Sequence, residues 1–348
     1  VYKRQLQEGV AFVEGAYLDG TQTTITISEH GNVVKTNKFH NVTQFWNSGD
    51  FEGLVREKLG RNLVESLEIM ARNELITTTY LRYSEAGAGA TPTSRATIAA
   101  DDLMLPIYGD KSRTLLMSRN ALGLNDGANS IACVIHPKQA YDIRRDAGED
   151  WKDVVTYAQP GQMPRGEEGM VNGVRYVLNN FCLLENAGVT VAQGQLDAAT
   201  VKGQGGPDSD EAGLLNYVTL GTGEGASFSV GDRVTIHKQS LGTAVLETDE
   251  TAETREIIQI STDNVYFDQP LFVAHSATDY VTNARDVYAA VVIGGPGLVW
   301  GVGALPSVIV PPIIDDFGRI NRVSWYGIFD YHMLRDVYTE VWLSAASI

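Results

Sequence analysis

The stretch PRGEEGMVNGVRYVLNN, residues 164–180, sets two adjacent glutamates and three glycines against an alternating apolar run. Such a cluster is typical either of an active-site loop or of a hairpin turn. A pair of catalytic carboxylates must approach one substrate from two sides, about 5 to 10 Å apart, whereas neighbouring side chains on a strand point to opposite faces. We therefore interpret Glu167 and Glu168 as hairpin residues and not as a catalytic dyad. The other adjacent acidic pairs predict turns or helix starts: Asp101–Asp102 and Asp315–Asp316.

The rest of this stretch predicts a structural hairpin. Gly169 and Gly173 allow the tight backbone path that a turn needs. The alternation from Met170 to Leu178 is typical of a strand, and it places both of these residues on one buried face.

Upstream, the run SIACVIHPKQAYDIRRD, residues 130–146, predicts a buried strand at 131–135 followed by a helix. The helix should begin at Pro137, where a missing N–H costs least. The helical pattern continues through DWKDVVTY, residues 150–157, and another helical region covers residues 98–122. Together with the hairpin, this mixture of elements predicts an α+β fold.

Residues 48–76 have a helical period. Such a helix of about 29 residues would be about 40 Å long. Glu57 and Arg61 form one of three acid-to-base pairs at i, i+4, and Gly60, inside the helix, predicts that another backbone passes close by. One stripe is apolar and predicts packing of a single face against a sheet: Phe51, Val55, Leu59, Leu63, Leu67 and Met70.

The N-terminal part predicts an extended arm followed by a projecting hairpin. Residues 1–20 have no clear period, and residues 21–39 alternate polar and apolar side chains, with His30-Gly31-Asn32 as a hairpin signal at their middle. Because this hairpin has little apolar surface of its own and isolated hairpins are marginally stable, we expect it to rest on something else, such as another subunit.

Residues 203–279 differ from the rest of the chain. Short strands separated by Gly-Asp, Thr-Asp-Asn and Gln-Pro turns predict a small all-β sandwich or barrel, inserted into the α+β domain. Residues 207–280 contain 13 acidic and 3 basic residues, a net −10 out of −16 for the whole chain. This acidity predicts either repulsion between neighbouring inserts or docking of a basic decoration protein.

Composition and motifs give no support for an enzyme. The net charge of −16 disfavours sequence-reading contact with nucleic acid, which depends on clustered Lys and Arg. The motifs HExxH, GxSxG and GxxxxGK[ST] do not occur in the sequence, so we expect no catalytic residues, no cofactor and no metal. The cysteines and histidines predict buried or satisfied side chains: Cys133, Cys182, His136, His237 and His275.

The uncharged run at residues 287–314 is long enough to span a bilayer. Nine glycines and prolines interrupt it, and lipid tolerates only continuous helix or closed barrel. We therefore predict a buried strand, a loop and a second strand here, and no contact with a membrane. A membrane-active peptide is the alternative.

Three motifs resemble one family. VIHPKQAYDIRR (residues 134–145), GEEGMVNGVRYVLNN (166–180) and DDFGRINRVSWYGIFDYHMLRDVYTEVWLSA (315–345) are similar to segments of tailed-bacteriophage major capsid proteins with the Hong Kong 97-type fold, in the branch typified by phage N4. The order of arm, projecting hairpin, long helix, α+β domain and late return strand is similar too. The likeness spans most of residues 45–200 and 285–348.

This resemblance implies a division of the chain. It implies an N-terminal arm at 1–20, an extended loop hairpin at 21–44, a peripheral domain with a spine helix at 45–95 and 312–348, an axial domain at 96–202 and 280–311, and the inserted acidic β domain at 203–279. In the extended loop it implies contact residues toward a neighbouring subunit: Thr24, Ile25, Ile27, Val33, Lys35 and Lys38. Some members of the wider fold join a loop lysine to a neighbour's asparagine, and Lys35 and Lys38 lie in the corresponding loop.

The implied function is structural. The chain would be the major capsid protein of a tailed double-stranded DNA bacteriophage, forming hexamers and pentamers of an icosahedral head and contacting the packaged DNA non-specifically. Its other partners would be portal and scaffolding proteins and a decoration protein on the insert, and it would assemble in the host cytoplasm and reside in the virion. Two alternatives are the shell protein of an encapsulin-like cellular compartment and an acidic, β-rich carbohydrate-active or adhesive protein.

Overall fold

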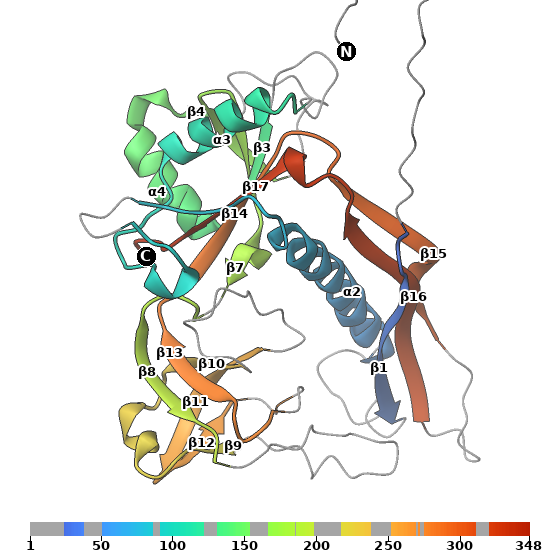
Figure 1. Cartoon of the computed structure of the whole chain (residues 1–348). Helices are drawn as coiled ribbons and strands as arrows, with labels where there is room; N and C mark the ends of the chain where they lie inside the picture. The colour runs from blue at the N-terminus through green and yellow to red at the C-terminus, as the bar shows by residue number, and fades with distance from the viewer. Residues whose placement is uncertain are drawn as a thin grey trace, which may run out of the picture.

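The structure is a computed structural model that describes residues 24–37, 51–85, 91–121, 131–153, 166–184, 186–197, 217–237, 252–268, 271, 275–310 and 320–348. The arm at 1–20, Lys38 and the Asp315–Asp316 pair lie outside these residues. The described chain has a mixed α+β fold with three sheets, as expected from the sequence (Figure 1). Its helices are α2 (Phe51–Ile76), α3 (Pro106–Ser118) and α4 (Pro137–Ala147), with short 3₁₀ segments η1 (Arg95–Thr97), η2 (Gly148–Asp150), η3 (Asn180–Cys182), η5 (Glu224–Ser227) and η6 (Asp336–Tyr338).

The first sheet is antiparallel and has the order β1 (Ser28–Asn37), β16 (Ile320–Met333), β15 (Leu298–Ile309). Helix α2 lies along one face of it (Figure 1). The apolar stripe predicted for the helix makes this contact: Val55, Leu59, Leu63, Leu67 and Met70 pack against Val323, Trp325 and Phe329 of β16. The prediction of a single apolar face packed on a sheet is confirmed.

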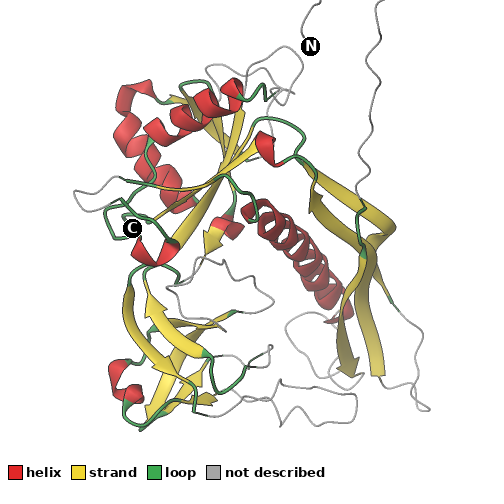
Figure 2. Ribbon diagram, in the orientation of Figure 1, coloured by secondary structure: helices red, strands yellow, loops and turns green. Residues whose placement is uncertain are grey.

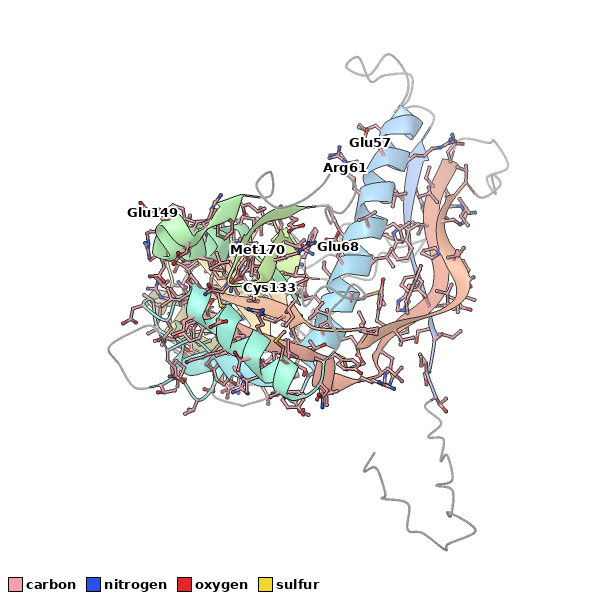
Figure 3. The ribbon with its side chains drawn as sticks, turned by 90° about the horizontal axis from the view of Figure 1, so that it is seen from above. Glu57, Arg61, Glu68, Cys133, Glu149 and Met170 are labelled. Atoms are coloured by element: carbon pink, nitrogen blue, oxygen red, sulfur yellow. The ribbon has the colours of Figure 1, made fainter. Side chains whose placement is uncertain are left out.

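Helix α2 differs from the prediction at one residue. A Cβ built on Gly60 would meet no atom within 4 Å, so the prediction of a close backbone there is wrong. The Glu57–Arg61 pair forms, with 2.8 Å between Oε1 and Nη2, and both side chains are more than half exposed. Figure 3 shows these two residues on the side of α2 that faces away from the first sheet.

The second sheet has eight strands. Its order is β2 (Leu81–Tyr83), β17 (Thr339–Ser344), β14 (Val287–Ile293), β3 (Ile131–Ile135), β6 (Val174–Leu178), β5 (Glu167–Val171) and β4 (Lys152–Asp153), and β7 (Leu183–Leu184) also pairs with β14. Helices α3 and α4 share a buried core with one face (Figure 2). The opposite face has its own core, in which the end of α2 takes part through Leu75 and Ile76.

The predicted junction of strand and helix is confirmed in this sheet. β3 leads through His136 into α4, which begins at Pro137. His136 is the N-cap, and its Nδ1 accepts a hydrogen bond from Lys138 N at 3.3 Å. Its ring also lies 4.7 Å from that of Tyr288 on β14.

Two other local predictions are wrong in part. Lys152–Asp153 pairs with β5 as a strand, whereas a continued helix was expected, because the exposed edge of β5 offers backbone partners that local periodicity cannot reveal. The helical region expected at 98–122 is shorter, because α3 begins only at Pro106. Residues 99–102 form a turn instead, in which the Asp102 carboxylate accepts from Ala99 N at 2.8 Å.

The third sheet has the order β8 (Thr190–Gln195), β13 (Tyr280–Ala284), β10 (Arg233–His237), β11 (Glu253–Ser261), β12 (Asn264–Phe267), β9 (Tyr217–Thr219). A bridge between Leu196 and Leu220 joins the two outer strands, with Asp197 N donating to Thr219 O at 2.9 Å. The sheet therefore closes into a barrel with its own apolar core. Its strands extend beyond the predicted limits of 203–279, since β8 and β13 both belong to it.

The sheets also divide the chain differently from the predicted domains. β15 was assigned to the same unit as β14 but pairs with β16 in the first sheet. β17 and β2 were assigned to the unit of the long helix, but both lie in the eight-stranded sheet. The consecutive strands β14 and β15 lie in different sheets, and so do β16 and β17. The physical reason is that each strand pairs with partners distant in sequence, so strands adjacent in sequence need not share a sheet.

Candidate functional site

The adjacent glutamates Glu167 and Glu168 contact different arginines. Glu168 contacts Arg144 of α4, whereas a Glu167 oxygen lies 3.7 Å from Arg175 Nε on β6. The two side chains therefore serve different elements, in agreement with the interpretation of this stretch as a hairpin. Among the residues that the structure describes, no group of three or more His, Cys, Asp or Glu side chains could hold a metal ion.

His237, His275 and the two cysteines are buried, as predicted, and His136 is half-buried. His237 Nε2 lies 2.7 Å from Thr282 Oγ1 inside the barrel. His275 lies between two carboxylates, with Nδ1 3.2 Å from Asp279 and Nε2 3.3 Å from Glu253. The two cysteines are free thiols and are both buried: Cys133 and Cys182.

The hairpin at residues 167–178 turns at Asn172 and Gly173, which have φ of +51° and +78°. This conformation suits asparagine and glycine. Val171 pairs with Val174, so Met170 lies opposite Arg175, on the face away from α3 and α4. The expectation that Met170 shares the buried face with Leu178 is wrong, because the two-residue turn changes the parity between its two strands.

The predicted extended loop has a different structure from the expected hairpin. Ser28–Asn37 is one continuous strand, and His30, Gly31 and Asn32 lie inside it, opposite Gly327, Tyr326 and Trp325. Gly31 serves a close approach and not a turn, since a Cβ there would lie 2.8 Å from Trp325 O. β16 supplies ladder hydrogen bonds along the whole of β1, and a turn at residues 30–32 would break them.

The two faces of the first sheet have different surroundings. Asn32 lies on the face toward α2, where its Nδ2 donates to Asn62 Oδ1 at 3.1 Å. The alternate residues of β1 point to the opposite face, which we call the open face. Four of the predicted contact residues have this parity, namely Ile25, Ile27, Val33 and Lys35, and Thr24 precedes β1 as an exposed residue.

On the open face, two isoleucines cover glycines of β15. A Cβ on Gly301 would lie 3.2 Å from Cγ2 of both Ile25 and Ile27. A Cβ on Gly303 would lie 2.8 Å from Ile27 Cδ1 and 3.2 Å from Ile328 Cγ2. The missing side chains of β15 thus let the segment before β1 lie across the sheet.

At its far end the centre of the sheet is buried under α2 through Val323 and Trp325, but its two outer strands carry exposed apolar side chains. We call this part the distal end: it comprises residues 33–37, 305–310 and 320–325, where β1 and β15 finish and β16 begins. Its exposed apolar side chains come from both faces and from the last residues of β15: Val33 (50% exposed), Val34, Leu305 (70%), Val308, Ile309 and Val310. Lys35 also lies here, opposite Arg322.

Such a concentration of exposed apolar side chains at the distal end is unusual for a surface that remains exposed to solvent. Single exposed valines are common, but here exposed apolar residues are consecutive in β1 and at the end of β15, the two strands that flank β16. The distal end is therefore the described surface best suited to burial against another molecule.

The fold is similar to that of a chain in a solved phage capsid. A chain of the capsid of Ralstonia phage GP4 matches 92% of this chain and 73% of its own length, with a TM-score of 0.52 and 11% identity. The two chains share a fold. At this identity, the likeness concerns the fold alone.

Two other structures show weaker likeness. A chain of the Cyanophage Pam1 capsid asymmetric unit has a TM-score of 0.47, 10% identity and coverage of 98% of this chain and 82% of its own. A chain of the holo-SrpI encapsulin complex from Synechococcus elongatus has a TM-score of 0.41 and 10% identity, and the match covers 92% of this chain and 75% of its own. No protein-family model matches the sequence, and no curated protein matches it.

Sequence reasoning missed the contribution of β15. The uncharged run at residues 287–314 was predicted to form a buried strand, a loop and a second strand, and β14 and β15 are these strands, but Leu305 and Ile309 on the second are exposed. The run of residues 298–310 contains no charged residue although most of its side chains are exposed. That combination is a signal for an interface, and only the burial of each residue reveals it.

Proposed function

We propose that this chain is the major shell subunit of a tailed-bacteriophage head, assembling with copies of itself into hexamers and pentamers around double-stranded DNA. The observation that carries the proposal is the distal end of the first sheet, where Val33, Leu305 and Ile309 are exposed together. The fold shared with a chain of a phage capsid supports it. The role is structural and needs no catalytic step.

The energetics favour burial of the distal end. Complete burial of a Val, Leu or Ile side chain is worth about 1.5–3 kcal/mol, so half-exposed side chains would each contribute roughly half of that. Six of them can offset a large part of the cost of association. In a closed shell the same contact is repeated in every subunit, which multiplies the effect.

Charge indicates that the partner is another copy. Lys35 and Arg322 are directly opposite on the two strands and place two positive charges at the distal end. The chain as a whole carries −16. A positive end therefore meets a predominantly acidic surface when two copies associate.

The same charge limits contact with DNA. A shell of this composition repels the phosphate backbone on average, so contact with the packaged genome would be weak and independent of sequence. The finer assignments complete the proposal: an N4-like Hong Kong 97-type subunit with peripheral and axial domains, portal and scaffolding partners, assembly in the host cytoplasm and residence in the virion.

The barrel is the proposed site for a basic decoration protein. Several of its carboxylates hold turns as well as carrying charge: Asp263 accepts from Gly223 N at 2.9 Å and from Gly225 N at 3.2 Å. Asp232 accepts from Ser229 N at 2.8 Å. Fixed carboxylates at loop tips form a preorganised negative surface, which lowers the cost of binding a cationic partner.

Electron microscopy of the purified chain tests the function directly. The wild-type chain should form closed particles, and Val33→Asp should raise the concentration needed for assembly by at least about tenfold, because a carboxylate would be desolvated in the contact. Val230→Asp is the matched control, since Val230 is 63% exposed but lies on the barrel. Assembly of Val33→Asp at the wild-type concentration would contradict the proposed role of the distal end, and persistent wild-type monomers would contradict the shell function.

A further inference from the structure

The chain passes three times between two bodies, one formed by the first sheet with α2 packed on it and the other by the eight-stranded sheet with α3 and α4. Residues 77–80 join α2 to β2, residues 294–297 join β14 to β15, and residues 334–338 join β16 to β17. In Figure 1 the C-terminal end of α2, the start of β15 and the end of β16 lie in one region with β14 and β17. Among the described residues, this junction connects the two bodies together with the packing of Leu75 and Ile76 on the eight-stranded sheet and a contact of Arg72 described below.

Backbone hydrogen bonds tie the second passage to the third. Gly294 N donates to Tyr338 O at 2.9 Å, and Leu334 N donates to Gly297 O at 2.8 Å. A Cβ on Gly297 would lie 2.9 Å from Arg335 O, so the two backbones are in close contact. These two passages therefore form one rigid pair.

Side chains tie the first passage to the third. The carboxylate of Asp336 accepts hydrogen bonds from the hydroxyls of Thr78 and Thr79, and from Thr79 N at 3.0 Å. The three donors thus converge on one carboxylate, with a separation of 257 or 258 residues in sequence. Charge-assisted hydrogen bonds of this kind are about twice as strong as neutral ones.

Two more contacts restrict the motion of α2. Glu74, in its last turn, accepts from Met333 N at 2.7 Å, so the helix and the end of β16 move together. Arg72 Nη1 donates to Phe181 O at 2.8 Å and to Leu183 O at 3.1 Å, which connects α2 to the eight-stranded sheet. Without the Asp336 contact, Arg72 and the buried Ile76 would still hold the end of α2 beside the eight-stranded sheet.

We propose that the contact of Asp336 with Thr78 and Thr79 is a latch that sets the angle between α2 and the eight-stranded sheet, and thereby the direction in which the distal end meets the next copy. The consequence for assembly rests on the proposed shell function. The latch itself does not, because it is a property of the single chain.

The length of α2 amplifies a small change at the latch. Its 26 residues make a rod about 39 Å long at about 1.5 Å per residue. A tilt of about 5° at the base moves the far end by about 3 Å, which is comparable to the length of a hydrogen bond. Apolar contacts at the distal end require alignment within atomic contact distance, so the latch determines which curvatures of a shell are compatible with the contact.

The test measures the angle in the unassembled and assembled chain by pulsed electron resonance between two spin labels. Glu57→Cys on α2 and Glu149→Cys on η2 carry the labels, and Figure 3 shows them on separate bodies. Burial raises the pKa of Cys182 to about 12, and burial raises that of Cys133 as well, so the native thiols should not react. Labelled chain is diluted with unlabelled chain so that only distances within one chain are recorded.

Asp336→Ala should broaden the distance distribution at least about twofold, and Thr78→Val with Thr79→Val should do the same while keeping the size of both side chains. The control is Asp268→Ala, which removes a carboxylate that accepts a hydrogen bond from Glu256 N at 3.1 Å within the barrel. A distribution for Asp336→Ala as narrow as that of the wild type would overturn the latch.

Electron microscopy of the same variants tests the consequence for assembly. The latch variants should give particles of mixed diameter, and the control should give the wild-type diameter. Uniform wild-type particles from a chain whose distance distribution has broadened would overturn the link between latch and curvature. If the wild-type chain forms no particles, the shell function fails, and the distance measurement still decides whether the latch exists.

Discussion

Replacement of Gly169 by alanine should destabilise the eight-stranded sheet. Gly169 lies on β5 with its α-carbon against the indole of Trp151. A Cβ at this position would lie 2.3 Å from Cζ2 and 2.5 Å from Cε2 of that ring. Carbon atoms in proteins do not approach this closely, so either the indole or the strand must move.

The magnitude follows from what the movement disrupts. Overpacking a filled site costs about 1–3 kcal/mol. The indole of Trp151 also stacks on Tyr176, with 5.9 Å between ring centroids, and loss of such a pair costs about 0.5–1.5 kcal/mol. We therefore expect Gly169→Ala to lower the free energy of unfolding by about 2–4 kcal/mol.

The matched control is Gly60→Ala on α2. No atom lies within 4 Å of a Cβ at Gly60, and the position is helical. Alanine should therefore stabilise the helix by about 0.5–1 kcal/mol, because glycine loses more backbone entropy on folding. The same chemical change is thus expected to have opposite signs at two positions.

Native-state hydrogen exchange suits this comparison, because it reports the free energy of opening for each amide in a chain with several cores. The β5–β6 amides should lose protection in Gly169→Ala, and the α2 amides should gain it in Gly60→Ala. A double-mutant cycle with Trp151→Leu isolates the mechanism, since Gly169→Ala should cost little once the indole is removed. Unchanged exchange in the β5–β6 amides of Gly169→Ala, or an equal cost with leucine at residue 151, would refute the packing argument.

Two further predictions concern single side chains. Burial, and next the Lys138 ammonium, lower the pKa of His136 below its ordinary 6.5, so the folded state favours the neutral ring whose Nδ1 caps α4. The contribution of His136 to the free energy of unfolding should therefore be complete above about pH 6.5 and fall as the pH drops toward the lowered folded pKa. Urea titrations at several pH values should show this dependence in the wild type and its loss in His136→Asn. Glu340 is fully buried, and its carboxylate lies 2.8 Å from Arg119 Nη2. Glu340→Gln should lower the free energy of unfolding by about 3 kcal/mol, because it leaves the charge of that arginine uncompensated. The control Glu57→Gln, at an exposed pair, should lower it by less than about 1 kcal/mol. Equal unfolding free energies for these two variants would contradict the reasoning.

Much of the secondary structure was predictable from the sequence because its causes are local. The apolar stripe of α2 depends on the helical period, and Pro137 after His136 marks a helix start that the structure confirms. Gly173, next to Asn172, supplies the positive φ that the hairpin turn requires. Each of these signals acts within about four residues, so it is visible without any partner.

The candidate site was predictable only in part. The alternation in residues 21–39 predicted a hairpin that rests on another subunit, whereas Ser28–Asn37 is one strand, and Val33 lies on its open face. The position of Gly31 in the middle of β1 was misread as a turn, because glycine permits a turn and a close strand approach alike. The exposed half of β15 was missed, since the sequence alone does not show which apolar runs find a core.

The sequence by itself determined the long helix α2, the junction of β3 with α4, the turn at Asn172 and Gly173, the α+β class and the acidity of the barrel segment. The tertiary structure decided which strands share a sheet, that β1 pairs with β16 almost 300 residues later, and that Asp336 meets Thr78 and Thr79. The physical reason is that periodicity and capping act between near neighbours, whereas strand pairing and the contacts between bodies join residues whose separation in the chain carries no local signal.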